Sequence, residues 1–172
     1  MRTVALLILW ILLFAASCND SEKASQQRMP TQEELIEANR LKVSKENQLI
    51  NRFIDQSGWD MKETETGIRY DIYHLEEDSN DAKSGDVVSI AYSLHLLDGT
   101  RISDTKMSGP VTFKVGQSDV VSGLHEAVTL LSVGDSVRLI LPSYLAYGLT
   151  GDQNKIPSNA ALFYDLSLVS LD

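Results

Sequence analysis

The chain is poor in the residues that build metal and redox sites. Its 172 residues include one cysteine, Cys18, and three scattered histidines, His74, His95 and His125. A single cysteine excludes an internal disulfide framework, a cysteine-rich zinc site and a C-x-x-C redox pair. We therefore expect no bound metal and no cofactor.

Basic residues are also scarce. The 15 Lys and Arg stand against 24 Asp and Glu, which gives a formal net charge of −9. They form no basic stripe of the kind that binds a phosphate backbone, so we expect no nucleic-acid partner. With 43% hydrophobic and 23% charged residues the composition is that of a globular protein, and the length suits one domain with a modest appendage.

No hydrophobic run in the sequence is long enough to span a membrane. The longest, Val4 to Ala16, falls short of the roughly 20 residues that a spanning helix needs. Arg2 precedes this run and the small residues Ala15, Ala16 and Ser17 follow it. This arrangement is typical of a secretory signal peptide, here residues 1–17.

Cys18 stands directly after the predicted signal peptide. The position resembles a bacterial lipobox, in which the cysteine thiol takes a lipid and anchors an exported protein to a membrane. Ala15 occupies a position where lipoboxes favour leucine, and Ala15-Ala16-Ser17 also suits ordinary signal peptidase, which would leave Cys18 as a free thiol. The favoured prediction is a lipoprotein on the periplasmic side or the cell surface.

A polar tether and a helix are expected next. Residues 18–30 combine the cysteine with a stretch that has no apolar period. Thr31 and Glu34 form a predicted capping box, and Gly58 is a suitable C-cap, so a helix is predicted within residues 31–58, from about Gln32 to Gln56. Its second half carries apolar residues at helical spacing, namely Leu49, Ile50, Phe53 and Ile54. We expect this half to dock on the protein's own domain; a dimer or partner helix is the alternative.

The remainder alternates between apolar and polar residues. Residues 59–84 hold a predicted leading strand, 67–74, and an acidic loop. From Gly85 onward, strands are predicted at 88–96, 111–115, 137–141 and 162–168, with a hairpin turn at Asp98-Gly99 and a short amphipathic helix at 121–131. This pattern predicts an α+β fold, an antiparallel sheet with one short helix over its apolar face.

Residues 85–172 resemble the FKBP-type peptidyl-prolyl cis-trans isomerases. Seven motifs follow one another in family order: Gly85-Asp86-Val87-Val88, Tyr92 with Leu97-Asp98-Gly99-Thr100, Phe113-Lys114-Val115-Gly116, Val120-Val121-Ser122-Gly123-Leu124, Ser132-Val133-Gly134-Asp135, Ala146-Tyr147-Gly148 and Ile156-Pro157. The resemblance implies a curved antiparallel sheet wrapped around a short helix, with the active site between them. It also implies proline-containing polypeptide substrates and a role in folding exported proteins.

The resemblance places the site residues position by position. The implied catalytic residues are Tyr92, Tyr147, Ile156 and Tyr164, and the implied substrate-binding residues are Ile102, Ser103, Val111, Val120, Val121 and Leu124. The family pattern has aromatics where Ile102, Val111 and Leu124 stand, and an aspartate where Ser103 stands, with Asp104 next to it. The resemblance therefore implies weak binding of the family's macrocyclic inhibitors.

The implied reaction needs no nucleophile, acid or metal. Its barrier is the partial double bond of the amide, about 18–20 kcal/mol. The twisted transition state has lost amide resonance, so an apolar pocket favours it over the planar ground state. The resemblance assigns the substrate carbonyl to two donors, the Ile156 backbone N–H and the Tyr147 hydroxyl. The implied pocket residues are mainly aliphatics and tyrosines, tyrosine titrates near pH 10, and His125 should turn away from the face of Leu124. We therefore expect isomerase activity that is independent of pH between about 6 and 8.

Two other functions are also compatible with the sequence. The missing aromatics favour a catalytically weak binding module or chaperone. In addition, Asn39-Arg40-Leu41, Gly58-Trp59 and Thr66-Gly67-Ile68-Arg69-Tyr70 resemble the gliding-motility-associated FKBP-type lipoproteins of the Bacteroidetes. That resemblance implies a tethered partner in a motility or secretion complex.

Overall fold

The computed structural model describes residues 28–76, 80–117 and 120–172. The chain divides into two compact units, Met1–Ile36 and Glu37–Asp172, and each is described by itself. The predicted signal peptide, Cys18 and most of the tether lie outside the described residues. None of the helices described is long and apolar enough to cross a membrane.

The helix α2, Gln32–Ser57, begins and ends at the predicted caps. The Thr31 N–H donates to Oε2 of Glu34 at 2.8 Å, and the Glu34 N–H donates to Oγ1 of Thr31 at 3.3 Å. Gly58, at a φ of 68°, donates its N–H to the Ile54 carbonyl at 3.0 Å. The capping box and the glycine C-cap are confirmed, because both ends satisfy backbone groups that a helix leaves without intrahelical partners.

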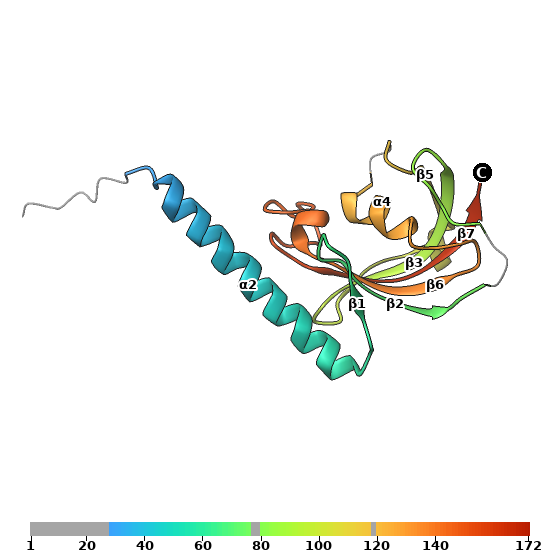
Figure 1. The fold of residues 1–172 in the computed structure, drawn as a ribbon, viewed down its shortest axis with the longest axis horizontal. Helices are drawn as coiled ribbons and strands as arrows, with labels where there is room; N and C mark the ends of the chain where they lie inside the picture. The colour runs from blue at the N-terminus through green and yellow to red at the C-terminus, as the bar shows by residue number, and fades with distance from the viewer. Residues whose placement is uncertain (1–27, 77–79, 118–119) are drawn as a thin grey trace, which may run out of the picture. The chain divides into compact units, whose positions relative to one another are not determined.

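A seven-stranded antiparallel sheet forms the body of the second unit (Figure 1). Its strands are β1 (Lys62–Glu63), β2 (Arg69–His74), β3 (Val87–Leu96), β4 (Arg101–Asp104), β5 (Val111–Lys114), β6 (Ser136–Leu141) and β7 (Leu162–Leu171). The strand order is β1-β2-β6-β7-β3-β4, and β5 also pairs with β3. The predicted α+β class, an FKBP-like curved sheet with one short helix and a preceding helix, is confirmed.

The main core lies between the sheet and α4, Ser122–Val128. Because successive side chains of a strand point to opposite faces, one set of alternating residues from β3, β6 and β7 faces this helix. The set includes Val88, Ile90, Leu94, Val137, Leu139, Leu141, Leu162, Tyr164, Leu166 and Leu168, all of them buried. From the helix, Leu124, Ala127 and Val128 complete the core.

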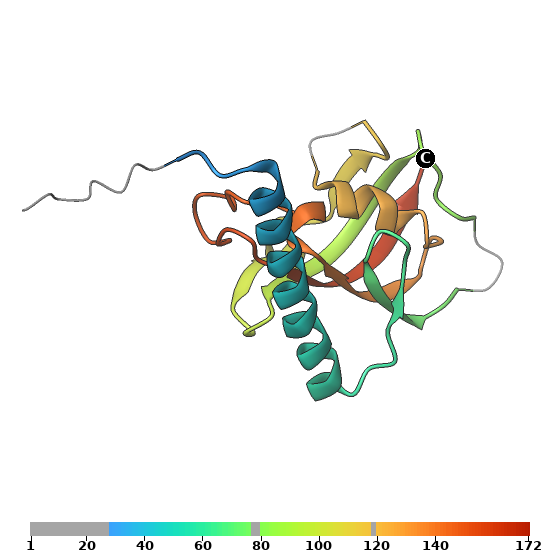
Figure 2. The ribbon, with the colours of Figure 1, turned by 60° about the vertical axis from the view of Figure 1, so that its left-hand side comes forward.

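The C-terminal half of α2 packs on a smaller cluster that includes residues of β6 and β7. Figure 2 shows the course of this helix along the domain. Ile50 is fully buried there against Ile140 and Ala161, with Phe53 and Ile54 partly buried alongside. The docking expected for this half is therefore present. Leu49 does not take part, since 54% of its surface is exposed.

Several short elements escaped prediction from sequence. They are β1, β4, the single turn α3 (Thr105–Ser108) and the 3₁₀ turn η1 (Ser143–Leu145). The helix predicted at 121–131 is shorter in the structure, where it ends at Val128 with Thr129 as its C-cap. Each of the four missed elements has four residues or fewer, which leaves little room for a helical or strand period.

Candidate functional site

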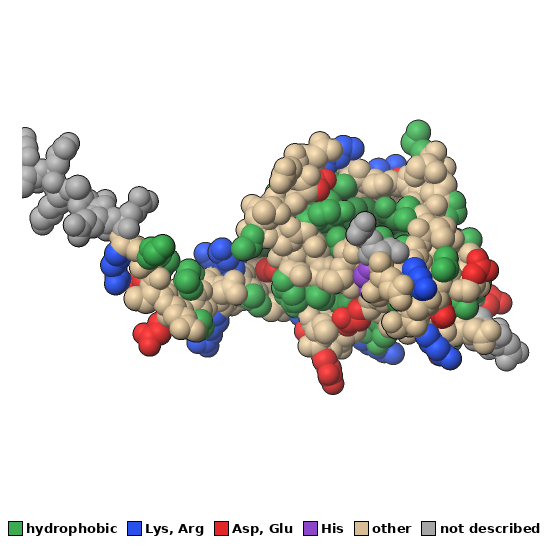
Figure 3. Space-filling model, turned by 90° about the horizontal axis from the view of Figure 1, so that it is seen from above, with side chains coloured by type: hydrophobic (Ala, Val, Ile, Leu, Met, Phe, Trp, Pro, Cys, Tyr) green, Lys and Arg blue, Asp and Glu red, His purple; other side chains and the backbone are tan. Residues whose placement is uncertain are grey.

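A cavity of about 300 Å³ opens between the sheet and the start of α4. Figure 3 looks onto the α4 side of the domain, where hydrophobic side chains gather in one area. The cavity collects seven of the ten residues predicted for catalysis or substrate binding, together with two that were not predicted. Its lining consists of Ile90, Tyr92, Leu94, Val111, Val120, Val121, Leu124, Tyr147 and Tyr164. None of these nine side chains is charged.

Two tyrosines from neighbouring strands meet at the sheet side of the cavity. The rings of Tyr92 on β3 and Tyr164 on β7 pack edge to face, with their centroids 5.4 Å apart. Tyr164 is 2% exposed, and its burial, with smaller effects of Tyr147 and Tyr92, raises the pKa of its hydroxyl. Neither hydroxyl donates to another group in the described part of the chain.

Tyr147 lines the cavity from the loop that follows η1. Its side chain is 39% exposed, so it reaches both the cavity and solvent. Partial burial, and then the proximity of Tyr92 and Asp152, raise the pKa of the Tyr147 hydroxyl. The hydroxyl therefore stays protonated at neutral pH and can donate a hydrogen bond.

Ile156 does not line the cavity. Its side chain is 4% exposed and packs in the core, and its backbone N–H donates to Oδ1 of Asp152 at 2.6 Å. The amide that the resemblance assigned to the substrate carbonyl is thus already bonded within its own loop.

Val121 offers an amide that sequence reasoning missed. It lines the cavity as the N-cap of α4, and its N–H has no acceptor among the residues described. The predicted helix start was a usable signal, because N–H groups at the beginning of a helix lack intrahelical partners.

Ile102 and Ser103 lie near the cavity without lining it. Ile102 is partly buried against the main core. Ser103 pairs with the cavity residue Leu94 across the β3–β4 ladder, so these two share a sheet face. Asp104 pairs with Ser93 and lies on the other face, where it accepts from Lys106 N–H at 2.8 Å and binds Arg101 at 3.0 Å.

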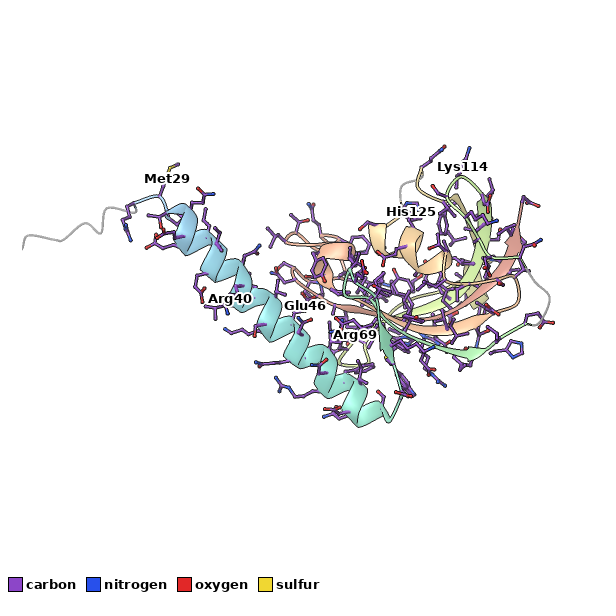
Figure 4. All side chains as sticks on the ribbon, in the orientation of Figure 1. Met29, Arg40, Glu46, Arg69, Lys114 and His125 are labelled. Atoms are coloured by element: carbon purple, nitrogen blue, oxygen red, sulfur yellow. The ribbon has the colours of Figure 1, made fainter. Side chains whose placement is uncertain are left out.

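The approach of α4 to the sheet depends on Gly123. A Cβ atom at this position would come within 2.7 Å of Leu141, so a larger residue would push the helix off β6. The next residue along, Leu124, lines the cavity, whereas His125 turns toward Gly116 and accepts its N–H on Nδ1 at 2.9 Å (Figure 4). His125 also packs edge to face on Phe113, at 5.5 Å between ring centroids. As predicted, the histidine points away from the face of Leu124.

This arrangement suits an uncharged ligand that is recognised by its shape and by a few hydrogen-bond donors of the protein. Aliphatic and aromatic side chains form the walls, and two lining residues, Tyr147 and Val121, carry a hydroxyl and an N–H that have no acceptor among the described residues. Such a pocket can desolvate a bound amide while it holds a carbonyl oxygen.

Comparison with known proteins assigns the family. The family model for FKBP-type peptidyl-prolyl cis-trans isomerases matches residues 78–169. Peptidyl-prolyl cis-trans isomerase FKBP11 of Bos taurus is 41% identical over 91 residues, which are 52% of this chain and 44% of the bovine protein. FkpA of Aeromonas hydrophila is 35% identical over 113 residues, or 65% of this chain and 41% of that protein.

FK506-binding protein 2 of Dictyostelium discoideum is 35% identical over 101 residues, which cover 58% of this chain and 76% of that protein. The chain thus spans less than half of the bovine and Aeromonas relatives. The matched segment contains the cavity and every strand from β3 to β7 apart from the end of β7. The chain belongs to the FKBP-type peptidyl-prolyl cis-trans isomerase family.

Proposed function

We propose that this protein is a peptidyl-prolyl cis-trans isomerase that acts on proline-containing segments of exported polypeptides. The observation that carries the proposal is the uncharged cavity, whose residues Tyr92, Tyr147 and Tyr164 come from three separate elements of the family-matched segment. The prolyl ring enters between the sheet and α4, and the preceding carbonyl stays near the rim.

Catalysis in this cavity is differential binding of the twisted amide. Rotation removes amide resonance, so the carbonyl becomes less polar and loses less hydration free energy when it leaves water. Val121, Leu124 and Tyr164 supply the apolar surroundings. The Tyr147 hydroxyl and the Val121 N–H orient the carbonyl, whereas the Ile156 N–H donates to Asp152 within its own loop.

The second candidate is a binding module or chaperone with little turnover. It is supported by the aliphatic residues Ile102, Val111 and Leu124, which replace the aromatics implied by the resemblance. The same reasoning extends to ligands: Ser103 in place of an aspartate should leave the cavity with weak affinity for FK506, the compound in the name of the Dictyostelium relative.

A proline-peptide assay on the soluble chain from Asn19 onward separates the two candidates. We expect the chain to accelerate isomerisation of a neutral Xaa-Pro peptide, and Tyr147→Phe to reduce the rate. A Lys106→Gln variant is the control, since this residue lies outside the cavity. A chain that binds the peptide without changing its isomerisation rate would establish the binding module instead.

The same proposal includes attachment to a membrane through lipidated Cys18. Its support is the sequence alone: a short apolar run, small residues and then the cysteine. The wild-type protein should partition into detergent, and Cys18→Ser should leave it uncleaved or soluble. An exported wild-type protein with an alkylatable Cys18 would reject the anchor.

The N-terminal helix supports a further, secondary proposal. α2 leaves Leu41 and Val43 exposed, at 53% and 38%, and these uncovered apolar side chains are the support for association with a second copy or with a motility or secretion complex of the Bacteroidetes type. Sedimentation of the chain from Asn19 onward should show a dimer. A monomer at all accessible concentrations would reject the self-association.

A further inference from the structure

A glutamate of α2 binds the turn that leads into the Tyr147 loop. Oε1 of Glu46 accepts the backbone N–H of Ser143 at 2.6 Å, and Oε2 accepts the hydroxyl of the same serine at 3.1 Å. Ser143 is the first residue of η1 and is 6% exposed. A carboxylate that accepts two hydrogen bonds from one buried residue holds that residue more firmly than a neutral acceptor would.

The turn cannot make this bond with its own side chains. Pro142 is the N-cap of η1 and has no side-chain acceptor for the N–H groups that follow. Glu46 therefore acts as the cap of η1 from another element, and it does so at 97 residues of sequence separation.

Ser143 in turn holds both neighbours of Tyr147. Its carbonyl accepts the Ala146 N–H at 3.0 Å and the Gly148 N–H at 2.8 Å. These two bonds fix the backbone on each side of the tyrosine. A continuous series of hydrogen bonds thus leads from Glu46 through Ser143 to the residues that carry the Tyr147 side chain.

Packing fixes the position of Glu46 itself. Ile50 follows it by one helical turn on the same face and is fully buried against Ile140 and Ala161. In Figure 4 the Glu46 side chain lies on the side of α2 that faces the domain. The docked half of α2 therefore presents the carboxylate to η1 in a defined place.

We infer that Glu46 is a positioning residue of the site, which sets the placement of the Tyr147 hydroxyl through Ser143. The inference rests on the proposed isomerase function and extends it, because it makes α2 part of the catalytic unit although the helix lies outside the family-matched segment. It also predicts that the isomerase domain without α2 loses the contribution of Tyr147.

The test is a double-mutant comparison in the chain from Asn19 onward, with kcat/KM for a neutral Xaa-Pro peptide as the readout. Glu46→Ala should lower kcat/KM by about fivefold, the factor expected for one hydrogen bond in the transition state. Glu46→Gln should restore most of this loss, because its amide oxygen still accepts the Ser143 N–H. Glu37→Ala is the matched control: it removes a glutamate nine residues earlier, on the opposite side of the same helix.

The combination with Tyr147→Phe decides between positioning and general stability. If Glu46 acts through the Tyr147 hydroxyl, Glu46→Ala adds nothing in the Tyr147→Phe background. Multiplicative losses would overturn the inference and leave the proposed function in place. An inactive wild-type chain would instead reject the proposed function and with it this role of Glu46.

Ser143→Ala keeps the test usable if Glu46→Ala does not fold. This variant removes the 3.1 Å hydroxyl bond and retains the 2.6 Å backbone bond. It should give a smaller loss of kcat/KM that again disappears in the Tyr147→Phe background. A loss that persists there would contradict the inference.

Discussion

Ser103 and Asp104 are adjacent on β4 and lie on opposite faces of the sheet. Ser103 is paired with Leu94, which lines the cavity, and Asp104 is paired with Ser93 and bound to Arg101. The Asp104 carboxylate caps α3 and cannot reach the cavity without breaking the β3–β4 register. It therefore does not replace the carboxylate that the resemblance places at position 103.

The first prediction follows from this register. Ser103→Asp should place a carboxylate on the cavity side of β4 and tighten FK506 binding by about tenfold or more, since a charge-assisted hydrogen bond contributes roughly 1.5–3 kcal/mol. Titration with FK506 measures the change. Asp104→Asn is the control and should leave the affinity unaltered, and a loss of affinity in that variant would mean that Asp104 does reach the ligand.

The second prediction concerns the role and protonation of Tyr147. Tyr147→Phe should reduce kcat/KM by about fivefold, or roughly 1 kcal/mol, through the loss of one donor. Because burial raises the pKa of this hydroxyl above its ordinary value, it does not titrate between about pH 6 and 8. The pH profile should be flat in both wild type and variant. A bell-shaped profile that His125→Ala abolishes would indicate acid–base catalysis instead.

The third prediction separates the ring of Tyr164 from its hydroxyl. Tyr164→Ala should lower the free energy of unfolding by about 3–5 kcal/mol, as truncation of a buried aromatic residue does. Tyr164→Phe should leave it unchanged or slightly higher, because the hydroxyl has no partner in the described part of the chain. Urea unfolding of the three proteins provides the comparison, and a clear destabilisation by Tyr164→Phe would reveal a bond that the hydroxyl makes.

The fourth prediction concerns the stability of the loop around Asp152 in acid. Its carboxylate accepts the N–H groups of Ile156 and Asn154, and the Ile156 bond is the main cause of its lowered pKa. A carboxyl whose pKa is lower in the folded state adds stability above its unfolded pKa, about 3.9, and loses it as the pH falls through the folded value. Unfolding measured at about pH 7 and pH 3 should therefore show acid destabilisation.

Asp152→Asn is the control for this effect. The amide oxygen still accepts hydrogen bonds but does not titrate in acid. The variant should lose less stability than wild type between the two pH values. Asp98, whose pKa is lowered mainly by the Thr100 N–H, keeps its own acid sensitivity in both proteins. Equal losses in wild type and Asp152→Asn would contradict the assignment to Asp152.

The sequence alone was sufficient to predict the elements that have a regular apolar alternation or a local capping motif. The alternation from Val88 to Leu96 predicted β3 within one residue, and Thr31, Glu34 and Gly58 marked both ends of α2. These features depend on neighbours within about four residues. The family motifs also identified seven of the nine residues that line the cavity. The order of these motifs along the chain is enough to match each one to a strand, helix or loop of the family fold.

Tertiary structure decided which groups are available for chemistry. The Ile156 N–H is bonded to Asp152, whereas the Val121 N–H has no acceptor among the described residues. Nothing in the sequence indicated that Asp152 would occupy the Ile156 amide. The contact of Glu46 with Ser143 joins residues 97 positions apart. The apolar spacing of the helix predicted its docking on the domain but not this polar contact. Hydrogen bonds and burial of this kind depend on how distant segments pack, which hydrophobic periodicity and turn residues do not encode.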